Sequence, residues 1–105
     1  MARVVAISTD LLLGSKVEAM LKAAGHEVTL APSLPEQLEG IDLIVADLDA
    51  EAPASLANLN IPVLGYYSHV NAETKKAAEA AGIDTVVPRS RMARELPDLA
   101  AKLLT

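Results

Sequence analysis

The residue best placed to do chemistry is Asp47, which ends the run Ile-Asp-Leu-Ile-Val-Ala-Asp at positions 41–47. A short apolar run that stops at a carboxylate is typical of a buried parallel strand with an acid at its carboxyl end. In open α/β sheets, ligands and reactions are found at that edge. Whether Asp47 can react depends on the side chains that join it there.

Four predicted strands end next to polar residues, and in a parallel sheet such ends meet at one edge. They supply carboxylates, hydroxyls, one imidazole and guanidinium groups, in Ser8, Thr9, Asp10, Asp47, Asp49, Tyr67, Ser68, His69, Arg89, Ser90 and Arg91. Several reactions are compatible with this set, so geometry must choose among them. A carboxylate that accepts a phosphoryl group needs cations beside it to offset the charge on the oxygens.

Each of these residues also has a purely structural explanation. Asp47 can cap the turn after its strand or pair with Arg89. Asp10 suits the N-cap of a helix better than metal ligation. Asp49 fits a solvated acidic loop. Ser68 and His69 are adjacent in sequence, whereas a nucleophile and its base usually meet only in space.

The elements that must position these residues alternate along the chain. Apolar and β-branched runs predict strands at positions 4–7, 26–31, 43–46, 61–66 and 83–87. Helical spacing and caps predict helices from Asp10 to Gly25 and over positions 33–40, 53–59 and 72–81, the last capped by Asn71. A helical turn at 90–95 and a final helix at 98–104, with Pro97 at its first position, complete the pattern.

This alternation predicts an α/β fold, with a five-stranded parallel sheet, right-handed crossovers and helices on both faces. We expect one flavodoxin-like domain over residues 1–105, with strand order 2-1-3-4-5. That order brings Ser8, Thr9 and Asp10 close to Asp47.

The composition excludes several classes of function. The chain has 105 residues, 51% of them hydrophobic, which is enough for one modest core. The absence of cysteine excludes disulfides, thiolate metal sites and a cysteine nucleophile. The net charge of −5 argues against general affinity for nucleic acid. No apolar run approaches the roughly 20 residues of a membrane span, and no signal peptide precedes the first strand, so we expect a cytoplasmic protein.

The strand pattern, the length and Asp47 at the end of the third strand resemble the receiver domain of bacterial two-component response regulators. The resemblance covers nearly the whole chain and rests on topology rather than on exact motifs. In that family the third-strand Asp accepts a phosphoryl group, and an acidic pair after the first strand holds Mg²⁺. A Ser or Thr ends the fourth strand, and a Lys-Pro pair ends the fifth.

The sequence departs from this pattern at three of the four characteristic positions. Ser8-Thr9, Tyr67 and Pro88-Arg89 stand where the acidic pair, the hydroxyl and the Lys-Pro pair are expected. Asp10 and Ser68 each come one residue late. The resemblance therefore implies a degenerate, pseudo-receiver-like acceptor site at Asp47.

We accordingly expect a signalling and interaction module that is not an enzyme, with Asp47 as a phosphoacceptor equivalent that is not phosphorylated. One alternative is a true phosphoreceiver in which Asp47 and Asp10 bind Mg²⁺ weakly; otherwise no cofactor is expected. Another is a protein that binds phosphate or a nucleotide at the carboxyl edge through Asp47, Ser68, His69 and Arg89.

The expected partner is a protein, with a second copy of the chain among the candidates, and not a nucleic acid or a membrane. The resemblance places the pairing face within residues 71–104, on the last two helices and the fifth strand.

Overall fold

A single parallel sheet organises the molecule, as shown by a computed structural model that describes residues 2–68 and 72–105. The sheet has five strands in the order β2-β1-β3-β4-β5. The strands are β1 Arg3–Ile7, β2 Glu27–Ala31, β3 Leu43–Asp47, β4 Val63–Tyr67 and β5 Thr85–Pro88. This order confirms the predicted flavodoxin-like topology and places the ends of β1 and β4 on either side of Asp47.

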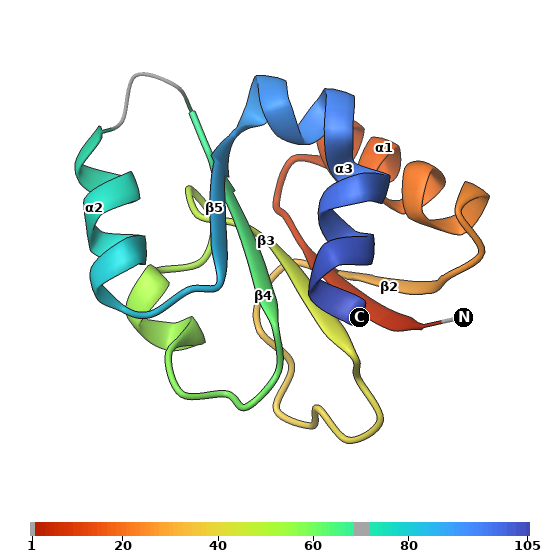
Figure 1. Cartoon of the computed structure of the whole chain (residues 1–105), viewed down its shortest axis with the longest axis horizontal. Coiled ribbons are helices and arrows are strands. Elements are labelled where there is room, and N and C mark those ends of the chain that lie inside the picture. The colour runs from red at the N-terminus through yellow and green to blue at the C-terminus, as the bar shows by residue number, and fades with distance from the viewer. Residues whose placement is uncertain (1, 69–71) are drawn as a thin grey trace.

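The helices cover both faces of the sheet. Helices α1 (Leu11–Ala23) and α3 (Arg89–Leu104) lie together on one face, whereas α2 (Ala72–Ala80) lies on the other, next to the short 3₁₀ helix η1 (Pro53–Leu56) (Figure 1). Over the described residues, no helix is long and apolar enough to cross a membrane.

Alternation along the strands divides the core into two layers. Val4, Ala6, Val45, Leu64 and Tyr66 pack with residues of α1 and α3 on one face. Their strand neighbours Val5, Ile7, Ile44, Ala46, Val63 and Tyr67 pack toward η1 and α2 on the other. Every residue of β3 and β4 is buried, as expected for central strands covered on both faces.

Helix α1 begins and ends where the sequence predicts. The Asp10 carboxylate caps its start by accepting the backbone N–H groups of Leu12 and Leu13. Gly25 follows its end with φ of +95°, a conformation that glycine adopts without strain. Gly14 allows close packing on β2, because a Cβ there would lie 2.9 Å from the Leu30 side chain.

The helix predicted between Ser33 and Gly40 is wrong, since the structure has only bends and turns there. The segment is short and contains Pro35, so the cost of starting a helix is not recovered. The capping box that Ser33 and Glu36 were expected to form is absent from the described contacts. Glu51 from another loop instead accepts the backbone N–H of Leu34.

The helix predicted over 53–59 is shortened to η1, because Asn58 and Asn60 take positive φ values of 61° and 58°. The prediction for the final segment is also wrong, because the observed helix is longer than the predicted one. The predicted break before Pro97 does not exist, and α3 is one continuous helix with Pro97 inside it. The predicted Asn71 cap lies outside the described residues.

Candidate functional site

Asp47 is the last residue of β3 and is almost fully enclosed, with 2% of its surface exposed. It lies level with Tyr66 in the ladder between β3 and β4, and its neighbour Ala46 lies level with Ile7 of β1. Ser8, directly after Ile7, is buried as well. The fold thus brings the ends of β1, β3 and β4 together around one carboxylate, as the sequence predicts.

Both oxygens of the Asp47 carboxylate have a partner. Oδ1 accepts the backbone N–H of Asp49 at 3.0 Å, which closes the turn after the strand. Oδ2 accepts Nη2 of Arg89 at 3.3 Å, an ion pair that confirms the predicted pairing. Burial raises the pKa of Asp47, and the Asp49 charge adds to this; the Asp49 N–H bond and the Arg89 charge oppose the increase.

Arg89 contacts a second carboxylate. The same Nη2 lies 3.9 Å from Oδ2 of Asp49, and that oxygen also accepts the hydroxyl of Ser68 at 2.9 Å. Asp47, Asp49, Ser68 and Arg89 therefore form one polar network, which we call the edge network. It joins the end of β3, the segment after β4 and the first residue of α3.

The side chain of Arg89 is 38% exposed overall, so it is only partly covered. Its Nε is buried without a hydrogen-bond partner among the described residues. A buried donor without a partner costs on the order of 1–3 kcal/mol. The ion pairs of the guanidinium with Asp47 and Asp49 compensate for this cost.

The segment after β1 is organised around α1 rather than around Asp47. The Ser8 hydroxyl accepts the backbone N–H of Asp10 at 3.1 Å and lies 3.2 Å from the Asp10 carbonyl oxygen, to which it can donate. The Asp10 carboxylate is occupied by the N-terminus of α1, which confirms the N-cap interpretation. Thr9 is exposed.

Tyr67, predicted as a neighbour of Asp47, and Tyr66 point to opposite faces of the sheet, and Tyr66 is the one level with Asp47. Tyr67 packs in the layer that faces α2. Tyr66 faces the other layer beside Asp47, and burial followed by the Asp47 charge raises its pKa to about 12. A hydrogen bond with Ser8 and the Arg89 charge oppose that increase. Strand alternation predicts that the two tyrosines face opposite sides of the sheet. It does not predict which of them lies beside Asp47, because that depends on the register between β3 and β4.

The carboxylates at the carboxyl edge have other partners among the residues that the structure describes. Among them, no group of three His, Cys, Asp or Glu side chains could hold a metal ion. The two carboxylates expected to share Mg²⁺ are both engaged, Asp10 by the N-terminus of α1 and Asp47 by the Asp49 N–H and Arg89. His69, the imidazole predicted for this edge, lies outside the described residues.

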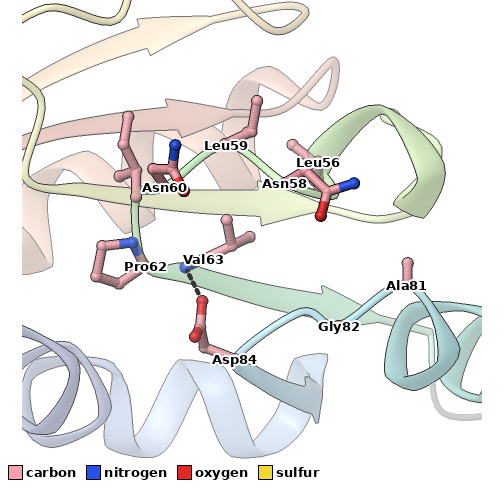
Figure 2. A pocket seen from close by; sticks show the side chains of 10 residues that line it. Leu56, Asn58, Leu59, Asn60, Pro62, Val63, Ala81, Gly82 and Asp84 are labelled. Atoms are coloured by element: carbon pink, nitrogen blue, oxygen red, sulfur yellow. Dashed lines mark hydrogen bonds between the residues drawn. The ribbon is translucent and has the colours of Figure 1, made fainter.

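Two of the hollows in the described part of the chain lie at opposite edges of the sheet. One, of about 400 Å³, opens at the amino-terminal edge of the sheet between η1 and the starts of β4 and β5, where Asp84 accepts the backbone N–H of Val63 at 2.8 Å (Figure 2). The other, of about 350 Å³, lies at the carboxyl edge of β1 and β2, lined by Ser8, Thr9, Leu11, Leu30, Ala31 and Pro32. Its mostly apolar lining offers little to a phosphate.

Comparison with solved structures shows which fold this is. The chain aligns over 99% of its length with a response regulator receiver domain protein from Clostridium thermocellum, at 15% identity and a TM-score of 0.84, covering 94% of that chain. It aligns equally fully with the receiver domain of Francisella response regulator 1452, at 20% identity and a TM-score of 0.82, covering 97% of that chain.

The non-phosphorylated HemR receiver domain from Leptospira biflexa gives a TM-score of 0.79 at 16% identity, over 100% of this chain and 95% of that one. No protein-family model matches the sequence, and no curated protein does either. The chain therefore has the flavodoxin-like fold of receiver domains, at a sequence identity that shows the fold alone.

Proposed function

We propose that this protein is a receiver-like signalling module that works by binding protein partners and that does not take a phosphoryl group on Asp47. The fold shared with response regulator receiver domains supports a signalling role. The observation that carries the proposal is the state of the Asp47 carboxylate. One oxygen is held by a backbone N–H and the other by a guanidinium.

Phosphoryl transfer to a carboxylate would require more than this edge supplies. The reaction places charge on the transferred oxygens, which a divalent ion and a further cation normally stabilise. Among the described residues, no group of three His, Cys, Asp or Glu side chains gathers to hold such an ion. Arg89, the cation beside Asp47, already contacts two carboxylates. We infer that the protein catalyses no reaction at this edge.

Binding surfaces are available beside the edge. Leu11 and Leu12, in the first turn of α1, are 77% and 87% exposed, unusual values for large apolar side chains. Exposed apolar groups of this kind are common in protein interfaces. We propose protein partners, a second copy of the chain among them, for this surface or for the face formed by α2, β5 and α3.

The first test is phosphorylation. The purified chain is incubated with acetyl phosphate and Mg²⁺, and its intact mass is measured at neutral pH. We expect no phosphoryl adduct. A labile adduct present in the wild type and in Asp49→Ala, but absent from Asp47→Ala, would establish the alternative function of a true phosphoreceiver, which the position of Asp47 at the end of β3 favours.

The second test is association. Sedimentation of the chain across a wide concentration range reports self-association, and thermal shift with phosphate and nucleotides reports small-ligand binding. We expect no stabilisation by phosphate or nucleotide, because the hollow at the carboxyl edge is lined mainly by apolar side chains. A clear shift with either would favour the small-ligand alternative.

A further inference from the structure

The edge network contains two carboxylates and a cation supplied by the chain itself. Nη2 of Arg89 lies 3.3 Å from Asp47 and 3.9 Å from Asp49. The two acids belong to the end of β3 and the turn after it, whereas Arg89 begins α3. A single guanidinium nitrogen thus lies within ion-pairing reach of both acids.

We propose that the Arg89 guanidinium is the resident cation of the carboxyl edge, so that this edge keeps its arrangement without a divalent metal. The proposal rests on the proposed function and deepens it, since a module that is not phosphorylated needs no metal at its acceptor position. If no metal binds at this edge, the Asp10 carboxylate is not needed as a ligand, which is consistent with its role as the cap of α1.

The way in which Arg89 is held supports this role. Its Nε is buried without a partner in the described part of the chain, while Nη2 reaches both carboxylates. A guanidinium stays charged at any pH that a folded protein experiences. Ser68 donates to the Asp49 oxygen that faces Arg89, which ties the segment after β4 to the same cation.

The proposal predicts a distinctive response to Mg²⁺. Melting temperatures are measured for the wild type and for Arg89→Ala in MgCl₂ and in NaCl of the same ionic strength. The wild type should melt at the same temperature in both salts. Arg89→Ala should melt about 5–10 °C lower in NaCl, because a nearly buried carboxylate loses its counter-charge. In MgCl₂ it should recover by about 2 °C or more, because the freed carboxylates can then bind the metal.

Arg91→Ala is the matched control. Arg91 lies two residues along α3, is exposed and pairs with Glu95 on its own helix. Its removal should change the melting temperature by about 1–2 °C at most, with no difference between the two salts. In the background of Asp47→Asn, removal of Arg89 should cost less than in the wild type, since the charge it balances is gone.

Three results would overturn the proposal. The first is stabilisation of the wild type by Mg²⁺ beyond the matched salt, a measurement that does not depend on any variant folding. The second is an Arg89→Ala protein as stable as the wild type. The third is a destabilised Arg89→Ala protein that Mg²⁺ does not restore. Labelling of the wild type by acetyl phosphate would instead refute the proposed function. That result is measured by intact mass and not by melting temperature, so the two proposals can fail independently.

Discussion

At the residue scale, the position of Asp47 combines two opposing effects. The strand end buries its carboxylate almost completely, while the Asp49 N–H and the Arg89 guanidinium stabilise its charge. Burial is the larger effect, because the pKa of Asp47 is raised above its usual value of 3.8. The folded state therefore holds a proton on this carboxyl more tightly than the unfolded chain does.

That direction fixes the pH dependence of its contribution to stability. Well below pH 3.8, the usual pKa of this carboxyl, it is protonated in both states. As the pH rises through the folded-state pKa, the native carboxyl ionises at a cost, and its contribution to stability falls. Asp47→Asn does not titrate and keeps the oxygen that accepts the Asp49 N–H. The free energy of unfolding of Asp47→Asn minus that of the wild type should therefore increase from pH 4 to pH 7.

Urea unfolding at each pH gives this difference directly. Asp98→Asn, which removes an exposed carboxylate from α3, controls for the loss of one negative charge. A difference for Asp47→Asn that falls with increasing pH would show that the ion pair with Arg89 outweighs burial, contrary to our expectation.

At the element scale, the start of α1 depends on one side chain. Asp10 accepts two backbone N–H groups that would otherwise lack a partner within the helix. Asp10→Ala should lower the free energy of unfolding by about 1 kcal/mol, the usual cost of losing an N-cap. The urea concentration at the unfolding midpoint should decrease, with little change in the dependence of the free energy of unfolding on urea concentration.

Thr9→Ala, a change at the exposed neighbouring residue, is the control and should leave the midpoint nearly unchanged. If both variants lost the same stability, the segment as a whole and not the cap would be responsible. The prediction also bears on the edge, because a carboxylate committed to α1 is not available to a metal.

The elements that local signals could not predict are those decided by packing. Ser33 and Glu36 are the residue types of a capping box. The segment nevertheless stays irregular, because no helical stretch long enough to pack against the sheet follows them. Pro97 suits the start of a helix, but the burial of Met92, Leu96, Leu99 and Ala100 at helical spacing keeps α3 continuous through it. The strand pattern, Asp47 and the Asp10 cap could be predicted because their signals are contained in a few adjacent residues.

At the scale of the whole molecule, one sheet supports two layers of core. The central strands β3 and β4 are buried on both faces, so both layers depend on the same strands and we expect them to unfold together. The side-by-side placement of Tyr66 and Asp47 has the same origin, since it follows from the register of two strands separated by 15 residues (48–62). Such a placement is settled by the complete fold and could not be predicted from either strand alone.

The two tyrosines allow this cooperativity to be tested. The chain has no tryptophan and two tyrosines, and Tyr66 lies in the layer of α1 and α3 while Tyr67 lies in the layer of α2. Tyr67→Phe therefore leaves a fluorescent reporter for the first layer, and Tyr66→Phe leaves one for the second. Within each variant, urea unfolding followed by tyrosine fluorescence and by far-ultraviolet circular dichroism should give the same midpoint, because a domain of this size unfolds in one step. A fluorescence midpoint below the dichroism midpoint in Tyr66→Phe alone would show that the α2 layer opens first. The sheet would then couple its two faces less tightly than their shared strands imply.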